Sequence, residues 1–206
     1  MNIPLHLINI SLSHEQIALY APDQDFVRKA YQDGSIAFPY WSQVWPAAIG
    51  LTEFILKHPE YIQHRNVLEL GAGLGLPSII ASRTANTVTS SDKEPDALDA
   101  IHHSIQHHSL SNCNTALIDW NEDFEQKQFD VLLLSDINYE PDQFKRLGQV
   151  MEQFLKNDGL ILLATPQRLM ARDFITSLQP RMQEHCTFSV RQDGTETLIS
   201  ILVLEA

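Results

Sequence analysis

Three glycines that alternate with other residues follow directly on an apolar run, and they constrain this chain more than any other feature. The run contains Glu69 and leads into Gly71, Gly73 and Gly75, and residues 76–83 then carry apolar side chains at helical spacing. Glycine has no Cβ, so it tolerates positive φ angles and lets the main chain lie close to a ligand. The pattern therefore predicts a strand, a tight turn and a helix start whose N–H groups face a nucleotide-like ligand.

The spacing of these glycines separates the known classes of nucleotide-binding loop. A dinucleotide site favours G-x-G-x-x-G, whereas here the third glycine is Gly75 and Leu76 follows it. A P-loop requires Gly-Lys-Ser or Gly-Lys-Thr, which the sequence lacks. An NAD-linked oxidoreductase and a merely glycine-rich turn stay as alternatives. The pattern that remains is E-x-G-x-G-x-G.

The charge of the chain restricts its partners. Its 206 residues suit one α/β domain with a full core, and 14 basic against 26 acidic residues give a net charge of −12. Nucleic-acid binding is disfavoured, because lysine and arginine contacts to phosphates supply most of that affinity. An acidic enzyme would instead attract basic protein surfaces.

Cysteine use and apolar runs bear on the compartment of the protein. Cys113 and Cys186 are too few for a disulfide framework and lack C-x-x-C spacing, so we interpret them as partly buried apolar residues. The first ten residues lack a basic region, and no apolar run approaches the ~18 residues of a membrane span. We therefore expect a cytoplasmic protein without a membrane partner.

The hydrophobic pattern alternates between strand and helix periods, which predicts a doubly wound, mostly parallel α/β sheet. A turn signal at Asp193-Gly194 predicts a C-terminal antiparallel hairpin. We expect one domain over 1–206, with a small N-terminal β extension over 1–45 and a Rossmann-like core over 46–206. The expected strands are two short ones within 5–20, then 66–70, 87–91, 115–118, 131–134, 160–164, 186–191 and 196–204; the expected helices are 25–31, one from 46, 76–83, 96–108, 141–156 and 168–178.

Polar residues at the predicted strand ends are candidate ligand contacts, because an open α/β sheet binds its ligand at the carboxyl ends of its strands. Asp92 follows the second core strand, where it can bind ribose hydroxyls or, alternatively, cap the next helix. Asp119 and Trp120 follow the third strand. There the acid can accept a hydrogen bond from an adenine amino group, and the ring can stack on the base or belong to the core.

The pattern E-x-G-x-G-x-G resembles motif I of the class I, seven-strand S-adenosylmethionine-dependent methyltransferases. With D-x-x-Y from Asp136 to Tyr139, D-W after the third strand and W-x-x-x-W-P from Trp41, the chain resembles the methyltransferase 16 group, which includes protein-lysine methyltransferases. The resemblance covers about residues 38–165. It implies S-adenosyl-L-methionine as cofactor and a seventh strand that runs antiparallel between the fifth and sixth.

The resemblance also implies a set of cofactor contacts. Glu69 would lie near the methionine end of the cofactor, with the glycines passing beneath it. Trp41 and Trp45 either help to wall the pocket or form an apolar plug over the sheet edge. The predicted cofactor-binding residues are Trp45, Glu69, Gly71, Gly73, Gly75, Asp92, Asp119, Trp120 and Ser135.

Asp136 and Tyr139 are the predicted catalytic residues. Methyl transfer from a sulfonium requires a positioned, neutral nucleophile and the exclusion of water. We expect Asp136 to orient an incoming lysine amine and Tyr139 to hydrogen-bond near it. The signature N/D-P-P-Y of nucleic-acid methyltransferases is absent, since Ile137 and Asn138 take the proline positions. A small-molecule amine as acceptor, or a cofactor-binding interaction module without catalysis, are the alternatives.

Four histidines in the predicted helix at 96–108 raise the question of a metal. His103 and His107 are four residues apart, a spacing that can bind zinc. No third ligand is evident and H-E-x-x-H is missing, so we interpret this surface as a solvated helix face and predict no metal site.

Overall fold

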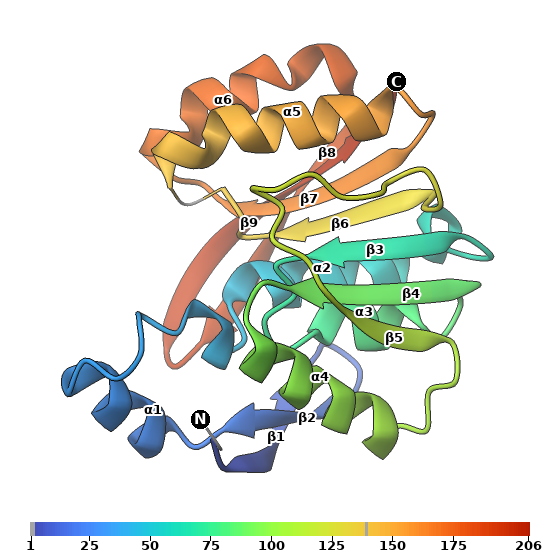
Figure 1. Ribbon diagram of the computed structural model, residues 1–206. Coiled ribbons are helices and arrows are strands. Elements are labelled where there is room, and N and C mark those ends of the chain that lie inside the picture. Colours follow the sequence, from blue (N-terminus) through green and yellow to red (C-terminus); the bar gives the residue numbers. More distant parts are fainter. Residues whose placement is uncertain (1–2, 139) are drawn as a thin grey trace.

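The computed structural model describes residues 3–138 and 140–206, and its centre is a seven-stranded sheet (Figure 1). Its strands are β3 (Asn66–Leu70), β4 (Thr87–Asp92), β5 (Cys113–Leu117), β6 (Val131–Ser135), β7 (Leu160–Pro166), β8 (Met182–Gln192) and β9 (Thr195–Leu204). They are ordered β5-β4-β3-β6-β7-β9-β8. The first five are parallel, and β9 runs antiparallel between β7 and β8. The expected mostly parallel sheet and its inserted antiparallel strand are confirmed.

Helices cover both faces of this sheet, as the alternating pattern predicts. One apolar cluster joins the sheet to α2 (Pro46–Lys57), α3 (Leu76–Ala81) and α4 (Pro95–His107). A second cluster joins the other face to α5 (Phe144–Leu155) and α6 (Arg172–Ser177). Figure 1 shows α5 and α6 on the side away from α4. Successive side chains of β6 enter the two clusters in turn, which explains its uninterrupted apolar sequence.

The N-terminal segment forms a small sheet of its own. Strands β1 (Leu5–Ser11) and β2 (Gln16–Pro22) pair antiparallel, and α1 (Gln24–Gln32) follows. The Tyr20 N–H donates to the Ser104 hydroxyl of α4 over 2.9 Å, and the His108 ring lies 2.7 Å from the Ala18 carbonyl. The expected β extension is confirmed and packs on the histidine-rich helix. His103, although exposed, places its ring 5.4 Å from that of Tyr20.

Element boundaries differ from the expected ones mainly where short 3₁₀ turns intervene. The predicted helix at 168–178 consists of η4 (Leu169–Ala171) and α6, and the one at 141–156 consists of η3 (Pro141–Gln143) and α5. Tight turns of this kind commonly open or close α-helices, and side-chain periodicity does not distinguish them. Two further 3₁₀ turns, η1 (Tyr40–Ser42) and η2 (Pro59–Tyr61), flank α2, and η5 (Gln179–Arg181) precedes β8. Within the described residues, no helix combines the length and apolarity that crossing a membrane requires.

Two glycines inside helices offer a matched test of packing against helix propensity. A Cβ at Gly148 of α5 would meet nothing closer than 4.0 Å, whereas at Gly50 of α2 it would lie 3.0 Å from the fully buried Ile199 of β9. We expect Gly148→Ala to raise the free energy of unfolding by about 0.5–1 kcal/mol. Gly50→Ala should lower it by about 1–3 kcal/mol through overpacking. Urea denaturation of both variants checks this, and equal stabilisation by both would contradict the packing at β9.

Candidate active site

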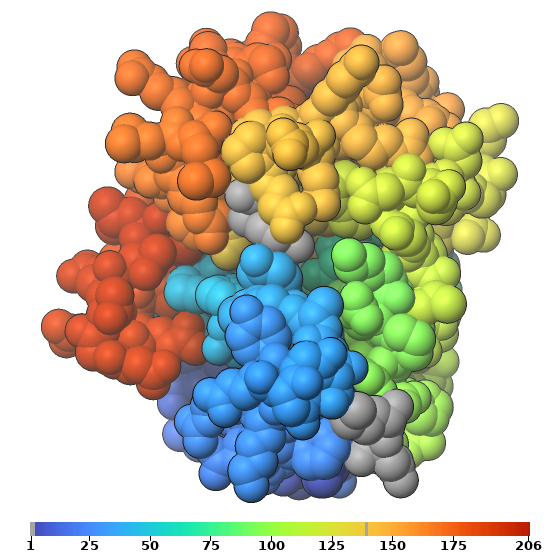
Figure 2. All heavy atoms as spheres, turned by 60° about the vertical axis from the view of Figure 1, so that its left-hand side comes forward, coloured from blue at the N-terminus to red at the C-terminus, as the bar shows by residue number. Residues whose placement is uncertain are grey.

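A cavity of about 540 Å³ opens at the carboxyl ends of β3, β4 and β6. It lies on the face where the N-terminal segment, blue in Figure 2, meets the yellow and orange residues that follow β6 and β7. Its volume falls within the range of small-molecule sites. Nine residues singled out in the sequence line it: Trp41, Trp45, Gly71, Gly73, Gly75, Asp92, Trp120, Ser135 and Asp136. Glu69 and Asp119 do not line it.

The glycine loop follows β3 with left-handed backbone at each glycine. Gly73 has a φ of +57°, and a Cβ there would lie 3.4 Å from the backbone oxygen of Trp41. At Gly75, with a φ of +72°, a Cβ would lie 3.1 Å from the Ile101 side chain. The positive φ angles and the close neighbours both favour glycine at these positions. Without a Cβ, the loop can pass between α4 and the segment before α2.

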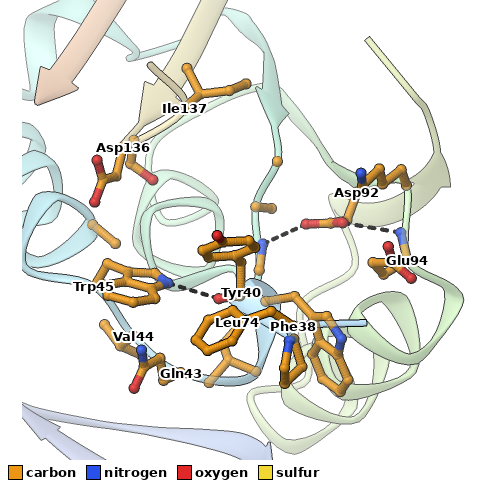
Figure 3. Close-up of a pocket in the computed structure, with 18 of the residues that line it drawn as sticks. Phe38, Tyr40, Gln43, Val44, Trp45, Leu74, Asp92, Glu94, Asp136 and Ile137 are labelled. Atoms are coloured by element: carbon orange, nitrogen blue, oxygen red, sulfur yellow. Dashed lines mark hydrogen bonds between the residues drawn. The ribbon is translucent and has the colours of Figure 1, made fainter. Parts of the chain in front are cut away.

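Asp92 braces this loop from the end of β4. Only 6% of the residue is exposed. One carboxylate oxygen accepts from the Gly73 N–H over 2.9 Å, and the other accepts from the Glu94 N–H over 3.1 Å (Figure 3). Burial raises the pKa of Asp92, while the Gly73 N–H opposes that shift. The cap residue of α4 is Glu94 rather than Asp92. Each carboxylate oxygen keeps acceptor capacity for a ligand.

Glu69 lies beneath the loop rather than in the cavity. It is fully buried, and one carboxyl oxygen accepts from the Ser78 N–H over 3.0 Å in the first turn of α3. Its other oxygen has no hydrogen-bond partner among the described residues. Burial is the main cause that raises the pKa of Glu69 to about 8, against the opposing hydrogen bonds from Ser78. The side chain supports the helix start and does not line the cavity, and its place near the methionine end of a cofactor stays a prediction.

Of the two candidate residues after β5, Trp120 lines the cavity and Asp119 does not. Trp120 is 8% exposed and borders the cavity while its ring also packs in the apolar cluster beneath α5. Asp119 instead accepts from the backbone N–H and the side-chain amide of Asn121, over 3.0 and 2.9 Å. Asn121 itself lines the cavity, although no sequence pattern marked it.

The two tryptophans before α2 both border the cavity, and one of them, Trp41, is also part of the apolar core. Trp41 is 8% exposed and belongs to the apolar cluster under α2, yet it also borders the cavity. The Trp45 ring nitrogen donates to the Tyr40 carbonyl over 2.7 Å, which fixes its ring along the cavity wall (Figure 3). Trp41 therefore belongs to the core and to the cavity wall at once, whereas Trp45 contributes to the wall.

Asp136 follows β6 and faces the cavity from the side opposite Asp92 (Figure 3). Its φ is +53°, a left-handed conformation that aspartate adopts more readily than most residues, and its N–H donates to the Ala164 carbonyl over 2.9 Å. Its carboxylate forms a two-point ion pair with Arg168, with one N···O distance of 2.9 Å. Non-glycine residues held in this conformation concentrate at functional sites.

Arg168 is a second residue of the site that sequence reasoning missed. A signal was available, because Arg168 follows the end of β7, and β7 neighbours β6. The same strand-end argument that selects Asp92 and Asp136 therefore also applies to it. Tyr139 lies outside the described residues, so its catalytic role stays a prediction.

The sheet order and a cavity at the strand ends define a Rossmann-like methyltransferase fold. A solved structure with this fold is the T. thermophilus 16S rRNA N2 G1207 methyltransferase, with a TM-score of 0.67 at 15% identity; the match covers 100% of this chain and 51% of that chain. At that identity the likeness concerns the fold alone. The sequence model of the lysine methyltransferase family matches residues 30–181, and the chain belongs to this family.

Curated relatives carry different acceptor names. A zebrafish protein N-lysine methyltransferase, METTL21A, is 31% identical over 145 residues, 67% of this chain and 66% of its own. A rat histone-arginine methyltransferase, METTL23, is 28% identical over 158 residues, 74% of this chain and 61% of its own. The human electron transfer flavoprotein beta subunit lysine methyltransferase is 31% identical over 57% of this chain and 44% of its own. The matches thus span less than two thirds of each relative's length.

The burial of Glu69 predicts a pH-dependent stability. Its pKa in the folded protein, about 8, exceeds the ordinary value of 4.5. The protonated form is therefore favoured by folding, and its contribution is complete below pH 4.5 and is lost as the pH rises towards 8. Relative to Glu69→Gln, the wild-type free energy of unfolding should fall over this window by at most about 1.4 kcal/mol per pH unit. Urea denaturation of both proteins at several pH values measures the difference, and a constant difference would refute the assignment.

Proposed function

We propose that this chain is an S-adenosylmethionine-dependent N-methyltransferase that methylates a lysine side chain of a protein. The observation that carries the proposal is that one cavity joins the glycine loop and Asp92 to Asp136 at its far side. Family membership supports the reaction, and the name of METTL21A supports lysine as the acceptor.

The residues of the cavity fit the cofactor that the family implies. Left-handed Gly73 leaves room for a close ligand, Asp92 has acceptor capacity left for ribose hydroxyls, and Trp120 offers an aromatic surface for a base. Asn121 would add a polar contact where Asp119 was expected. S-adenosylmethionine, when bound, supplies an electrophilic methyl group on a sulfonium sulfur.

Residues of the cavity wall would favour the neutral form of the acceptor amine. A lysine amine has a reference pKa of ~10.4, so a neutral amine at pH 7 costs about 4.6 kcal/mol. Trp41, Trp45 and Ile137 make part of the cavity wall apolar, which favours the neutral form. The lone pair of the neutral amine would then accept the methyl group that bound S-adenosylmethionine supplies, with S-adenosylhomocysteine as the leaving group. The methylammonium formed would release its proton to solvent.

The rim of the cavity favours a protein acceptor over a small amine. Leu169 and Met170, which directly follow Arg168 of the cavity wall, are 91% and 57% exposed. Across the cavity, Phe38 and Tyr40 are each nearly half exposed, with ring centroids 4.5 Å apart. Exposed apolar groups beside a site are typical of protein-docking surfaces.

The net charge of −12 favours a basic partner, and a cytoplasmic location accords with the reduced cysteines expected there.

Radiolabelled cofactor incubated with the protein and cell lysate tests the function. We expect a labelled protein band whose hydrolysate contains methyl-lysine. Asp136→Asn, which suits the left-handed backbone, should lower transfer by about 100-fold or more through loss of acceptor positioning. Its affinity for S-adenosylhomocysteine in calorimetry should stay within a few fold.

Each other result has its own meaning. Methyl-arginine would place the chain with METTL23 in acceptor type. A labelled small product would favour the metabolite alternative. Cofactor binding without transfer would favour a non-catalytic interaction module, and absence of S-adenosylhomocysteine binding would revive an NAD-linked enzyme.

The rim gives a second prediction for a protein acceptor. The double variant Leu169→Ala, Met170→Ala should raise KM for the protein substrate by about 5–10-fold, the size of a modest interface contact. Its kcat should stay near the wild-type value, because neither side chain lines the cavity. The control is Leu117→Ala, which removes a leucine that is 65% exposed and also does not line the cavity. Equal KM values for the two variants would exclude docking at 169–170.

A further inference from the structure

The ion pair between Asp136 and Arg168 is built into the sheet edge. Ser135 and Ala164 are register partners on β6 and β7, so the residues just beyond them emerge side by side. The Asp136 N–H is bonded to the Ala164 carbonyl, and the Arg168 N–H donates to the Pro166 carbonyl over 2.8 Å. Backbone hydrogen bonds therefore hold the main chain of both residues in place, independently of the ion pair between their side chains.

Burial makes this pair different from a surface salt bridge. The Asp136 side chain is 8% exposed and that of Arg168 is 30% exposed. Both guanidinium Nη atoms contact the two carboxylate oxygens, a fork that sets the orientation of the carboxylate as well as its charge. Both residues line the cavity, so the pair faces the space in which a methyl acceptor would bind.

The other charged groups around the cavity are mostly acidic. They are Asp92, Lys93, Glu94, Asp96 and Glu140, with the phenol of Tyr40 as a further titratable group. Arg168 and Lys93 are therefore the cations among the described lining residues, and Lys93 is exposed next to the buried Asp92. Without Arg168, the carboxylate of Asp136 would add an unbalanced negative charge to an acidic surface.

We propose that Arg168 is a positioning residue for methyl transfer, which orients the Asp136 carboxylate and offsets its charge so that the acceptor amine stays neutral. The proposal rests on the proposed function and adds a residue to it. A nearby carboxylate without a cation stabilises an ammonium and raises its pKa. An amine that must lose its proton before attack would then react only at higher pH. In the ion pair, Asp136 can still accept a hydrogen bond from the acceptor amine. Because Arg168 offsets its charge, the carboxylate stabilises the ammonium form of that amine less than an unpaired carboxylate would.

The pH dependence of kcat at saturating cofactor and protein acceptor tests this role, because kcat reports the ionisations of the bound complex. In Arg168→Gln we expect the acid limb to move to higher pH by about one to three units, because the remaining carboxylate stabilises the ammonium. Arg168→Lys keeps the charge but loses the fork, so its limb should stay near the wild-type position while kcat falls. Arg172→Gln, which removes an exposed arginine four residues away, is the matched control and should reproduce the wild-type profile.

The double variant Asp136→Asn, Arg168→Gln separates charge from folding. It removes both charges, so its acid limb should return towards the wild-type position even though its rate is low. Thermal melts and calorimetric binding of S-adenosylhomocysteine verify that each variant is folded. An acid limb that stays in place in Arg168→Gln overturns the inference. A lower KM together with a higher kcat in Arg168→Gln also overturns the inference, because Arg168 would then compete with the acceptor amine for Asp136.

The wild-type profile separates this inference from the function on which it rests. A wild-type protein that transfers no methyl group to any amine overturns both. A wild-type protein that methylates lysine, with an acid limb that Arg168→Gln leaves unmoved, overturns only the role of Arg168.

Discussion

The hydrogen bond from the Gly73 N–H to the buried carboxylate of Asp92 connects the parts on which the site depends. It ties the loop after β3 to the end of β4, and so it sets the position of the main chain along one wall of the cavity. The loop accepts this position because Gly73 adopts a left-handed conformation close to Trp41. The segment before α2 thereby packs directly on the loop. Movement of any one of these three elements would alter the space open to a cofactor.

Three buried acids at the strand ends show three ways of accommodating a carboxyl group. Glu69 is enclosed completely, and its raised pKa favours the neutral form. Asp92 is held by backbone N–H groups, which stabilise a charged carboxylate. Asp136 has a guanidinium as its partner. Because desolvation, hydrogen bonds and an opposite charge act in different proportions, these three acids differ in what they do: Glu69 supports a helix, Asp92 braces the loop, and Asp136 lines the cavity beside Arg168.

The walls of the cavity and the exposed apolar residues around it come from different parts of the fold. The walls from the glycine loop and the strand ends belong to the shared methyltransferase fold, since a solved structure of low sequence identity superposes on the whole chain. The exposed apolar residues Phe38, Tyr40, Leu169 and Met170 instead come from the N-terminal segment and from η4, outside the central strands. Relatives named for lysine methylation and for arginine methylation both match this chain. In proteins generally, loops and outer segments vary more than the scaffold that carries them.

Much of the fold and part of the site follow from local sequence alone. Hydrophobic periods place the strands because a strand buried on both faces must be apolar throughout, as at 131–134, and alternating glycines define the loop because few other residues adopt its backbone. Position along the chain predicts cofactor contacts for Glu69 and Asp119, but neither side chain lines the cavity, because only packing decides which way a strand-end side chain turns. The pairing of Arg168 with Asp136 likewise depends on β7 lying beside β6, which brings together residues 32 positions apart. The helices, the strands and the glycine loop follow from the sequence, because they depend on neighbours along the chain. Which acids face the cavity, and which cation balances Asp136, depends on the folded structure, because charge and burial depend on neighbours in space.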